Sequence, residues 1–480
     1  MRILKTILIL FFFTSSSFSQ QQSPNILLII ADDMGIDVTP GFGISGNLPV
    51  TPTLNSLREK GLSFTNCWAS PQCSPTRAAL LSGKYGIKTG VMRPPLILGT
   101  SHTSLFTKIN EQSPTDYAMG LIGKWHLGGN NKNYSHPKDS GVPYYEGVFT
   151  SQVDDYYDWT KVNSEENEEQ VKEYATSHLT NSAISWIDNQ TKPWFLWLAH
   201  VAPHAPFQTP PDGTYTTSPT NNRTTYFSMI ESMDYEINRL LESMDDETLE
   251  NTVIIFIGDN GTPGQANTYW PNGHAKSSIY EGGIRVPLII SGKSVERVNE
   301  VETSLVQATD LHATILELAG VQLLGGTENS LSLKPSLSFE NQVSKKINYT
   351  DYENGNIEFW ATRNDTYKLI EDENGNEEFY NIVLDIKEET NLIGNLTSEQ
   401  ETIKTMLQQE AQTIRNDWSC NDGIKNGTET TIDDCNNTCG TVDILTYDNI
   451  DCSYSPSNPS VYYEFIEQYD RVVYSNNYPN

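Results

Sequence analysis

One cysteine lies where the sequence predicts the start of a short buried helix. Residues 71–83 read as a loop followed by a helix, with Ser74 as the N-cap, a proline in the first helical position and Gly83 as the stop. Cys73 is therefore expected just outside the helix N-terminus, where free N–H groups and the helix dipole favour an anion. Arg77 lies one turn inside the helix and is expected to point to the same place. The stretch thus predicts a reactive group beside a negatively charged ligand.

Two other stretches of the chain end in paired oxygen ligands. An unbroken apolar run, typical of a central parallel strand, ends in Asp32 and Asp33, and a second β-rich run leads to Asp259 and Asn260. Ligands in open α/β sheets bind at the carboxyl ends of the strands. These four side chains offer oxygen, without sulfur or imidazole, which favours Ca²⁺ or Mg²⁺ over zinc. Taken singly, each pair is equally typical of a turn or a cap.

Several basic side chains follow other predicted strands. Lys124 and His126 alternate along the chain, so on an extended segment they share one face. His204 lies between two prolines in a stiff loop just past an apolar strand, whereas His200 at the end of that strand is expected to be structural. Taken alone, each of these histidines is more often a packed or surface residue than a catalytic one.

The Cys73 stretch is similar to the signature of the type I sulfatases, the formylglycine-dependent branch of the alkaline-phosphatase superfamily. The family pattern Cys-x-Pro-Ser-Arg is matched at residues 73–77, with Thr76 in place of the commoner serine. Other family motifs, such as Gly-Lys-Trp-His-Leu-Gly and Lys-x-x-x-Tyr-Glu-Gly-Gly-x-Arg-Val-Pro, follow in family order across about residues 24–392. The first of these is matched within residues 121–128 and the second at residues 276–287, and the segment 201–206 resembles the family's substrate-side histidine segment.

The resemblance implies a modified residue and a metal. Cys73 would be oxidised to formylglycine by a formylglycine-generating enzyme or its equivalent, and one Ca²⁺ would bind in each catalytic site. The implied metal ligands are Asp32, Asp33, the formylglycine at Cys73, Asp259 and Asn260. The implied catalytic residues are Cys73, Arg77, Lys124, His126, His204 and Lys276, whereas Glu281 and Arg285 look structural.

The family chemistry assigns these residues their roles. The formylglycine aldehyde hydrates to a geminal diol, and one hydroxyl attacks sulfur while the metal, Lys124, Lys276 and His204 hold the sulfate oxygens. The leaving alcohol takes a proton from His204 or Lys276. His126 then takes the proton of the second hydroxyl, the diol expels sulfate, and Arg77 stabilises the diol. Without the modification, Cys73 would be an inert thiol or would pair with Cys67 in a disulfide.

Elements far apart in the sequence must bring these residues together, and the sequence predicts an α/β fold. Buried strands and an amphipathic helix at residues 226–244 indicate a large mixed, mostly parallel sheet sandwiched by helices, alkaline-phosphatase-like by resemblance. Residues 360–370 and 378–382 read as paired strands of a smaller C-terminal antiparallel sheet, followed by a helix around residues 398–416. The predicted domains are a signal peptide (1–19), a catalytic α/β domain (20–328), a C-terminal sheet subdomain with its helix (329–417) and an acidic Cys-rich tail (418–480).

Composition bounds the location and the partners of the chain. Arg2, Lys5 and the apolar run that follows them read as a signal peptide, which predicts a secreted or periplasmic protein; the alternative is an uncleaved anchor. Lys plus Arg is 31 and Asp plus Glu is 61, a net charge of −30 that repels nucleic acid and anionic membranes. We expect no nucleic-acid partner and no other membrane span. Disulfides are expected among the four cysteines of the tail, Cys420, Cys435, Cys439 and Cys452.

The function that these expectations favour is that of a secreted sulfatase, a sulfuric ester hydrolase acting on a sulfated carbohydrate, either a polysaccharide or an oligosaccharide. The alternative within the same superfamily is a formylglycine-dependent hydrolase of phosphodiesters or phosphonate monoesters. If Cys73 stays unmodified, the chain could instead be a secreted glycan-binding protein without turnover.

Overall fold

The structure is a computed structural model, and it describes residues 23–323, 328–343, 345–416, 464–466 and 471–473. The predicted signal peptide and the four tail cysteines lie outside these residues. Within the described part of the chain, no helix is long and apolar enough to cross a membrane.

Four parallel strands form the centre of the large sheet. They are β1 (Asn25–Ala31), β4 (Ala118–Gly123), β8 (Trp194–Ala199) and β9 (Thr252–Gly258). They lie in the order β9-β1-β8-β4, so strands far apart in the sequence are neighbours. Every residue of β1, β8 and β9 is buried, as expected for parallel strands that are covered on both faces.

Shorter strands extend this centre into a ten-stranded mixed sheet with the order β11-β2-β10-β9-β1-β8-β4-β5-β6-β7. On one side β10 runs antiparallel to β9, and on the other β5 is parallel to β4 while β6 and β7 turn back antiparallel. The added strands are β2 (Gly61–Phe64), β5 (Tyr145–Gly147), β6 (Trp159–Asn163), β7 (Glu168–Val171), β10 (Leu288–Gly292) and β11 (Glu300–Glu302).

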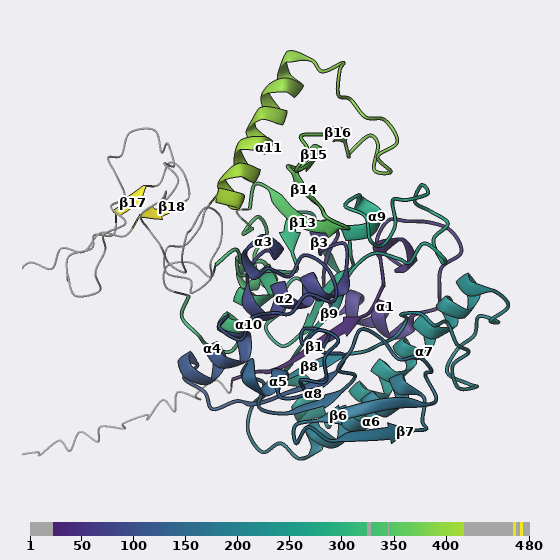
Figure 1. The fold of residues 1–480 in the computed structure, drawn as a ribbon. Helices are drawn as coiled ribbons and strands as arrows, with labels where there is room; N and C mark the ends of the chain where they lie inside the picture. Colours follow the sequence, from purple (N-terminus) through teal and green to yellow (C-terminus); the bar gives the residue numbers. More distant parts are fainter. Residues whose placement is uncertain (1–22, 324–327, 344, 417–463, 467–470, 474–480) are drawn as a thin grey trace, which may run out of the picture.

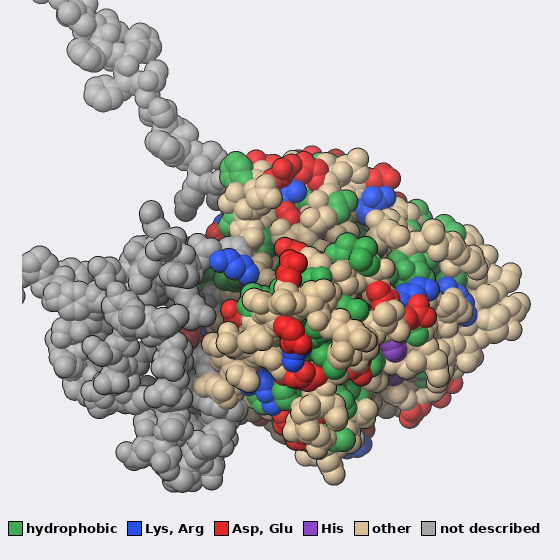
Figure 2. Space-filling view, turned by 90° about the horizontal axis from the view of Figure 1, so that it is seen from above, with side chains coloured by type: hydrophobic (Ala, Val, Ile, Leu, Met, Phe, Trp, Pro, Cys, Tyr) green, Lys and Arg blue, Asp and Glu red, His purple; other side chains and the backbone are tan. Residues whose placement is uncertain are grey.

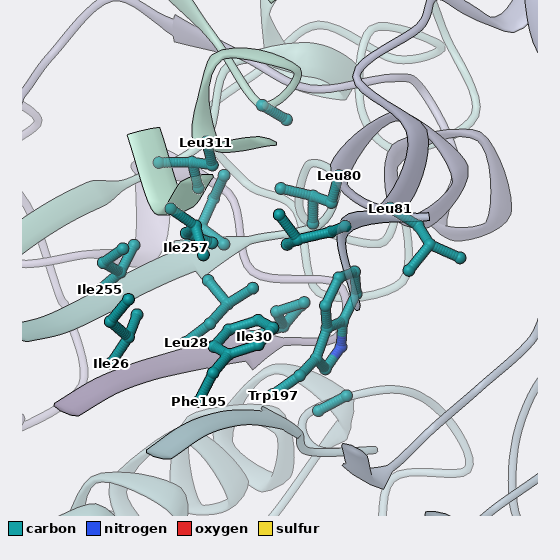
Figure 3. Packing of buried hydrophobic residues seen from close by; sticks show 14 of the residues in the cluster. Ile26, Leu28, Ile30, Leu80, Leu81, Phe195, Trp197, Ile255, Ile257 and Leu311 are labelled. Carbon is teal, nitrogen blue, oxygen red and sulfur yellow. The ribbon is translucent and has the colours of Figure 1, made fainter. Parts of the chain in front are cut away.

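Helices cover both faces of the sheet. Strand side chains alternate between the faces, so Leu28 and Ile30 pack with Leu80 and Leu311 on one side (Figure 3), while Ile29 packs on the other. The first face is covered by α2 (Cys73–Ser82), α4 (Leu105–Gln112) and α10 (Asp310–Leu318). The second face is covered by α1 (Pro52–Glu59), α6 (Ala175–Asp188) and α7 (Asn222–Ser243).

A separate antiparallel sheet follows the large one. It consists of β13 (Asn348–Asn354), β14 (Ile357–Arg363), β15 (Tyr367–Asp372) and β16 (Glu377–Asn381), and α11 (Ser398–Asn416) packs on it. Figure 1 shows this unit at the opposite end of the view from β6 and β7. The predicted fold class, a large mixed sheet with helices plus a small antiparallel sheet, is confirmed; the position of the boundary near residue 329 stays a prediction.

A buried ionic cluster joins the two sheets. Glu281, in the short helix α9 (Glu281–Ile284), lies 3.4 Å from the Lys368 ammonium of β15 and accepts a hydrogen bond from the indole N–H of Trp68 at 3.1 Å. The Lys368 ammonium also lies 5.0 Å from the centre of the Trp68 ring, a cation–π contact. Glu281 is thus a structural residue, as expected, and Arg285 lies at the edge of the same cluster, 3.9 Å from Glu281.

Two predicted elements need correction. The single strand expected at residues 360–370 is two strands, because the Asn364 side chain accepts hydrogen bonds from the N–H groups of Thr366 and Tyr367 and closes a turn. The helix expected at residues 226–244 begins earlier, at Asn222, because Asn221 and Thr224 form a capping box.

The remaining elements are short. They are η1 (Ile36–Val38), β3 (Cys67–Trp68), α3 (Gly86–Thr89), α5 (His136–Asp139), α8 (Asp246–Glu250), β12 (Val306–Gln307), η2 (Lys334–Leu337), β17 (Glu464–Ile466) and β18 (Arg471–Val473).

Candidate active site

The carboxyl ends of the four central strands meet at one edge of the sheet. Asp32 follows β1 directly, Asp259 follows β9, Lys124 follows β4 and His204 lies five residues after β8. The register pairs Ala31, the last residue of β1, with Gly258, the last residue of β9. Asp32 and Asp259, the next residue after each strand, therefore lie side by side. The sheet topology therefore gathers residues that span more than 220 positions of the chain.

The predicted oxygen ligands form one buried cluster. The N–H of Asp33 donates to Asp259 Oδ1 at 3.0 Å, and the side-chain amide of Asn260 donates to Asp33 Oδ1 at 2.9 Å. All four predicted ligands, Asp32 included, are at most 2% exposed. Carboxylates at this depth are stable only beside compensating positive charge.

Three basic side chains supply that charge. Lys124 Nζ lies 2.5 Å from Asp32 Oδ2, and Lys276 Nζ forms an ion pair with Asp33 Oδ1. Arg77 donates twice to Asp259 Oδ2, from Nε at 3.1 Å and from Nη2 at 2.7 Å, and once to the carbonyl oxygen of Lys124 at 2.8 Å. Three carboxylates and three cations thus balance within one buried volume.

The ion pairs shift the pKa values of their members. Burial alone would raise the pKa of Asp33, but the charges of Lys276 and His204 outweigh burial and hold that pKa well below its usual range. Burial alone would lower the pKa of Lys276, but Asp33 and other nearby negative charges raise it. Both members of this pair therefore stay charged at neutral pH.

Cys73 lies against His126. The distance between Cys73 Sγ and His126 Nδ1 is 3.2 Å, and the Ser74 hydroxyl donates to the His126 carbonyl at 2.9 Å, which ties the two segments together. His126 adopts a φ of 57°, a left-handed conformation that is unusual for a residue other than glycine. Burial raises the pKa of the Cys73 thiol, so the unmodified side chain is a neutral thiol rather than a thiolate.

The N-cap prediction for α2 is wrong by two residues. Cys73 is the first residue of the helix rather than a residue outside it, and Gln72 is the N-cap, without a side-chain capping bond. The Ser74 hydroxyl is engaged with His126 and cannot cap the helix. Gly83 ends the helix with a φ of 76°, as expected. Cys67 and Cys73 are both free thiols, so the disulfide alternative is wrong.

His204 lies beside Asp33, and its side chain is 12% exposed. Its Nε2 is 3.7 Å from Asp33 Oδ2, and its Nδ1 is 2.6 Å from the carbonyl oxygen of Ala205. A carbonyl oxygen only accepts, so Nδ1 carries a proton and Nε2 is the nitrogen that faces the site. His200, by contrast, is fully buried, and neither of its ring nitrogens has a hydrogen-bond partner among the described residues.

The cluster also fits a hard cation. Asp32 Oδ1 and Asn260 Oδ1 are buried and, among the described atoms, have no hydrogen-bond partner. Asp32, Asp259 and Cys73 offer ligand atoms that all lie within 4.8 Å of one another, and so do Asp32, Asp33 and His204. Buried acceptors without donors are costly, and a cation with oxygen ligands would satisfy them.

Other side chains around the site had no signal in the sequence. The Tyr226 hydroxyl donates to the Asp33 carbonyl at 2.7 Å, and the Gln72 amide donates to the Ser277 hydroxyl at 3.1 Å beside Lys276. Tyrosine in an amphipathic helix and glutamine in a loop are ordinary surface or core residues, so only the fold identifies these contacts.

Comparisons with known proteins agree with this geometry. A family model described as Sulfatase matches residues 24–321, and one described as N-sulphoglucosamine sulphohydrolase, C-terminal, matches residues 273–417. Arylsulfatase J of Mus musculus is 30% identical over an alignment of 328 positions that covers 62% of this chain and 53% of that protein. The chain thus spans about half the length of that relative.

Two further relatives cover more of the chain. The ulvan-active sulfatase of Formosa agariphila is 25% identical over an alignment of 420 positions that covers 80% of this chain and 79% of that protein. The crystal structure of Ps i-CgsB in complex with k-i-k-neocarrahexaose is 26% identical, has a TM-score of 0.71 and covers 82% of this chain and 93% of its own.

Proposed function

Because this chain belongs to the sulfatase family, we propose that it hydrolyses sulfate esters through a formylglycine made from Cys73. The observation that carries the proposal is the contact between Cys73 and His126, 3.2 Å apart, beside a buried cluster of three carboxylates and three cations. A nucleophile, a base and fixed positive charges within one volume are what sulfuryl transfer needs.

The metal in this proposal is one Ca²⁺ held by Asp32, Asp33, Asp259, Asn260 and the oxygen that replaces the Cys73 sulfur. When bound, it would supply positive charge for the ionised hydroxyl of the formylglycine hydrate and for the sulfate oxygens. The two unpartnered oxygens, Asp32 Oδ1 and Asn260 Oδ1, support this ligand set. The protein cluster is neutral without a metal, so a divalent cation would leave the site positive and suited to an anion.

The chain's own residues divide the remaining work. Lys124 and Lys276, fixed by their ion pairs, would hold sulfate oxygens, and removing one such donor typically costs about 10²–10³ in rate. His126 would take a proton from the second hydroxyl at position 73, so that this oxygen forms the C=O bond of the aldehyde while the C–O bond to the sulfate breaks and sulfate leaves. Arg77 would fix Asp259 and the Lys124 backbone.

We assign protonation of the leaving alcohol to His204 rather than to Lys276. The Lys276 ammonium is bound to Asp33 and serves as a fixed charge, whereas among the described residues His204 Nε2 has only a 3.7 Å contact with Asp33, too long for a hydrogen bond.

The proposed substrate is a sulfated polysaccharide or oligosaccharide, and the proposed location is outside the cytoplasm. Relatives named for ulvan and solved with a neocarrahexaose support the substrate class. The predicted signal peptide supports export, and a formylglycine-generating enzyme or its equivalent is the required partner. The surface carries many acidic side chains (Figure 2), so a polyanionic substrate would be attracted only by the local charge of the site.

The test of the proposal compares Cys73→Ser with Cys73→Ala after expression with a maturation enzyme. The tryptic peptide 61–77 contains both Cys67 and Cys73, so the wild type should show one alkylated thiol and one hydrazide-reactive aldehyde in the same peptide. With 4-nitrophenyl sulfate, the serine variant should accumulate a covalent sulfate ester, because it lacks the second hydroxyl whose proton His126 removes. The alanine variant should show no adduct.

Three outcomes would contradict the proposal: two alkylated thiols in the wild type, repeated turnover by the serine variant at the wild-type rate, or an adduct on the alanine variant. A matched pair, 4-nitrophenyl sulfate and bis(4-nitrophenyl) phosphate, tests the phosphodiester alternative. Preference for the phosphate would support that alternative instead.

A further inference from the structure

Tyr156 holds the turn that carries His204, although the two residues are 48 positions apart. The Tyr156 side chain is fully buried, and its hydroxyl lies 2.8 Å from the carbonyl oxygen of His204 and 2.7 Å from that of Val201. The N–H of His204 donates to the same Val201 carbonyl at 3.1 Å. One hydroxyl thus binds both ends of a four-residue turn.

Tyr156 is itself held from three directions. Its N–H donates to Gln208 Oε1 at 2.6 Å, and its carbonyl accepts from the N–H of Ala175, the first residue of α6, at 2.8 Å. Its ring stacks on Tyr174, with centroids 5.4 Å apart and planes at 27°. The turn is therefore anchored to the helical layer behind the sheet rather than carried by a free loop.

The direction of the His204 ring depends on this turn. The acceptor of its Nδ1–H is the carbonyl of the next residue, Ala205, so the ring is oriented by backbone that the turn itself supplies. A displacement of the turn therefore changes the position of His204 Nε2 relative to both Asp33 and Cys73. Displacements of about 1 Å at a reacting group can cost about 10² in rate.

We infer that Tyr156 is a positioning residue that sets the orientation of His204 through its hydroxyl. The inference rests on the proposed function, in which His204 protonates the leaving alcohol. It concerns one atom, Tyr156 Oη, because the ring stacking and backbone bonds of this residue would survive its removal.

The chain offers a matched pair of variants. Tyr156→Phe removes the hydroxyl with two carbonyl partners, whereas Tyr174→Phe removes a hydroxyl from the stacked neighbour that has no hydrogen-bond partner among the described residues. Both changes delete one oxygen from a buried tyrosine in the same packing environment. A general effect of deleting a hydroxyl there would appear in both variants, and a positioning effect only in the first.

The first readout is the kcat/KM ratio of 4-nitrophenyl sulfate to phenyl sulfate. 4-Nitrophenolate is a weak base and leaves without being protonated. Phenolate is a stronger base, so its departure depends more on a proton from His204. Tyr156→Phe should lower kcat with phenyl sulfate about 10-fold or more, with KM little changed, and lower 4-nitrophenyl sulfate turnover much less. His204→Ala should change the ratio in the same direction, and Tyr174→Phe should leave it at the wild-type value.

The second readout does not depend on turnover. With ¹³C-labelled histidines, the signal that disappears in His204→Ala identifies His204 among the eight histidines of the chain. That signal should shift in Tyr156→Phe and stay in place in Tyr174→Phe, at equal Ca²⁺ concentration. A folded Tyr156→Phe protein with an unshifted signal and an unchanged ratio would overturn the inference.

Two further outcomes keep the proposals apart. A wild type with two alkylated thiols in the peptide 61–77, but whose His204 signal shifts in Tyr156→Phe, would refute the proposed function and leave the positioning role intact. If Tyr156→Phe does not fold, Gln208→Met removes the acceptor of the Tyr156 N–H, so it loosens the backbone that places the Tyr156 hydroxyl and should shift the same signal by a smaller amount. An unshifted signal in that variant would overturn the inference.

Discussion

Replacing Arg77 by lysine keeps the positive charge of the site but removes the planar guanidinium and its set of hydrogen bonds. The guanidinium makes two hydrogen bonds to one oxygen of Asp259 and a third to the Lys124 carbonyl, and the side chain is 1% exposed. A lysine has one nitrogen and can reach the carboxylate or the carbonyl, not both with good geometry. At least one buried acceptor therefore loses a charge-assisted bond.

The expected cost follows from these contacts. Hydrogen bonds to charged groups contribute about 1.5–3 kcal/mol each, and breaking a buried ion pair costs about 3–5 kcal/mol. Because Arg77→Lys keeps the ion pair but loses one or two bonds, we expect a loss of about 3 kcal/mol in the free energy of unfolding. Turnover of 4-nitrophenyl sulfate should fall about 10²-fold, because Asp259 and the Lys124 backbone would lose their fixed positions.

Arg239 provides the matched control. It also donates from Nε and Nη2 to a single carboxylate oxygen, Glu236 Oε2, at 2.8 and 2.5 Å, but its side chain is 35% exposed on the surface of α7. Arg239→Lys should therefore cost less than about 1 kcal/mol. Both variants are compared with the wild type by urea unfolding at one fixed Ca²⁺ concentration, since bound metal adds to stability. Equal losses in the two variants would refute the argument that burial gives the Arg77 contacts their value.

Three other predictions follow from the same structure. Asn260→Ala should raise the Ca²⁺ concentration needed for half-maximal turnover at least about 10-fold without loss of fold, and an unchanged requirement in a calcium titration would remove Asn260 from the ligand set. A chain ending at residue 416 should keep the turnover of 4-nitrophenyl sulfate, because every residue of the cluster precedes α11; a folded but inactive chain would show that the tail completes the site. Burial raises the pKa of Asp351 to about 6, above its unfolded value near 3.8, so the stability that its protonated form contributes is lost as the pH rises from about 4 to 7. In urea unfolding, the free energy of unfolding of Asp351→Asn should rise relative to that of the wild type by about 2–3 kcal/mol over that pH range. A difference that does not change with pH would contradict the raised pKa.

Much of the site could be predicted from the sequence because its residues follow elements with strong patterns. The apolar runs before Asp32 and Asp259 predict buried parallel strands, and parallel strands end at one edge of a sheet. The ion pairs of Lys124 and Lys276 are also consistent with that expectation, although no pattern in the sequence pairs a given lysine with a given carboxylate. That pairing depends on side-chain distances that only the fold supplies.

The rest could not be predicted because it depends on competition between neighbours. Ser74 has the ideal chemistry for an N-cap, yet its hydroxyl donates to the carbonyl of His126, a partner 52 residues away. Asn364 looks like one residue of a continuous strand, yet its side chain closes a turn and divides that strand in two. Tyr156 gives no sign in the sequence that its hydroxyl reaches the turn of His204.

The burial of Cys73 would limit the time available for its proposed conversion to formylglycine. Every residue of α2 is buried, and the N–H of Ser277 donates to the carbonyl of Pro71, so a segment some 200 residues later in the chain closes over the cysteine loop. If Cys73 is matured as proposed, the modifying enzyme would have to reach the thiol before that closure, because Cys73 is 3% exposed in the folded chain. At a synthesis rate of about 5–20 residues per second, the interval between the emergence of the two segments is about 10–40 s. Slower folding of the sheet would keep the thiol accessible for longer than this interval, and the fraction of active enzyme would then depend on how fast the chain folds as well as on how much maturation enzyme is present.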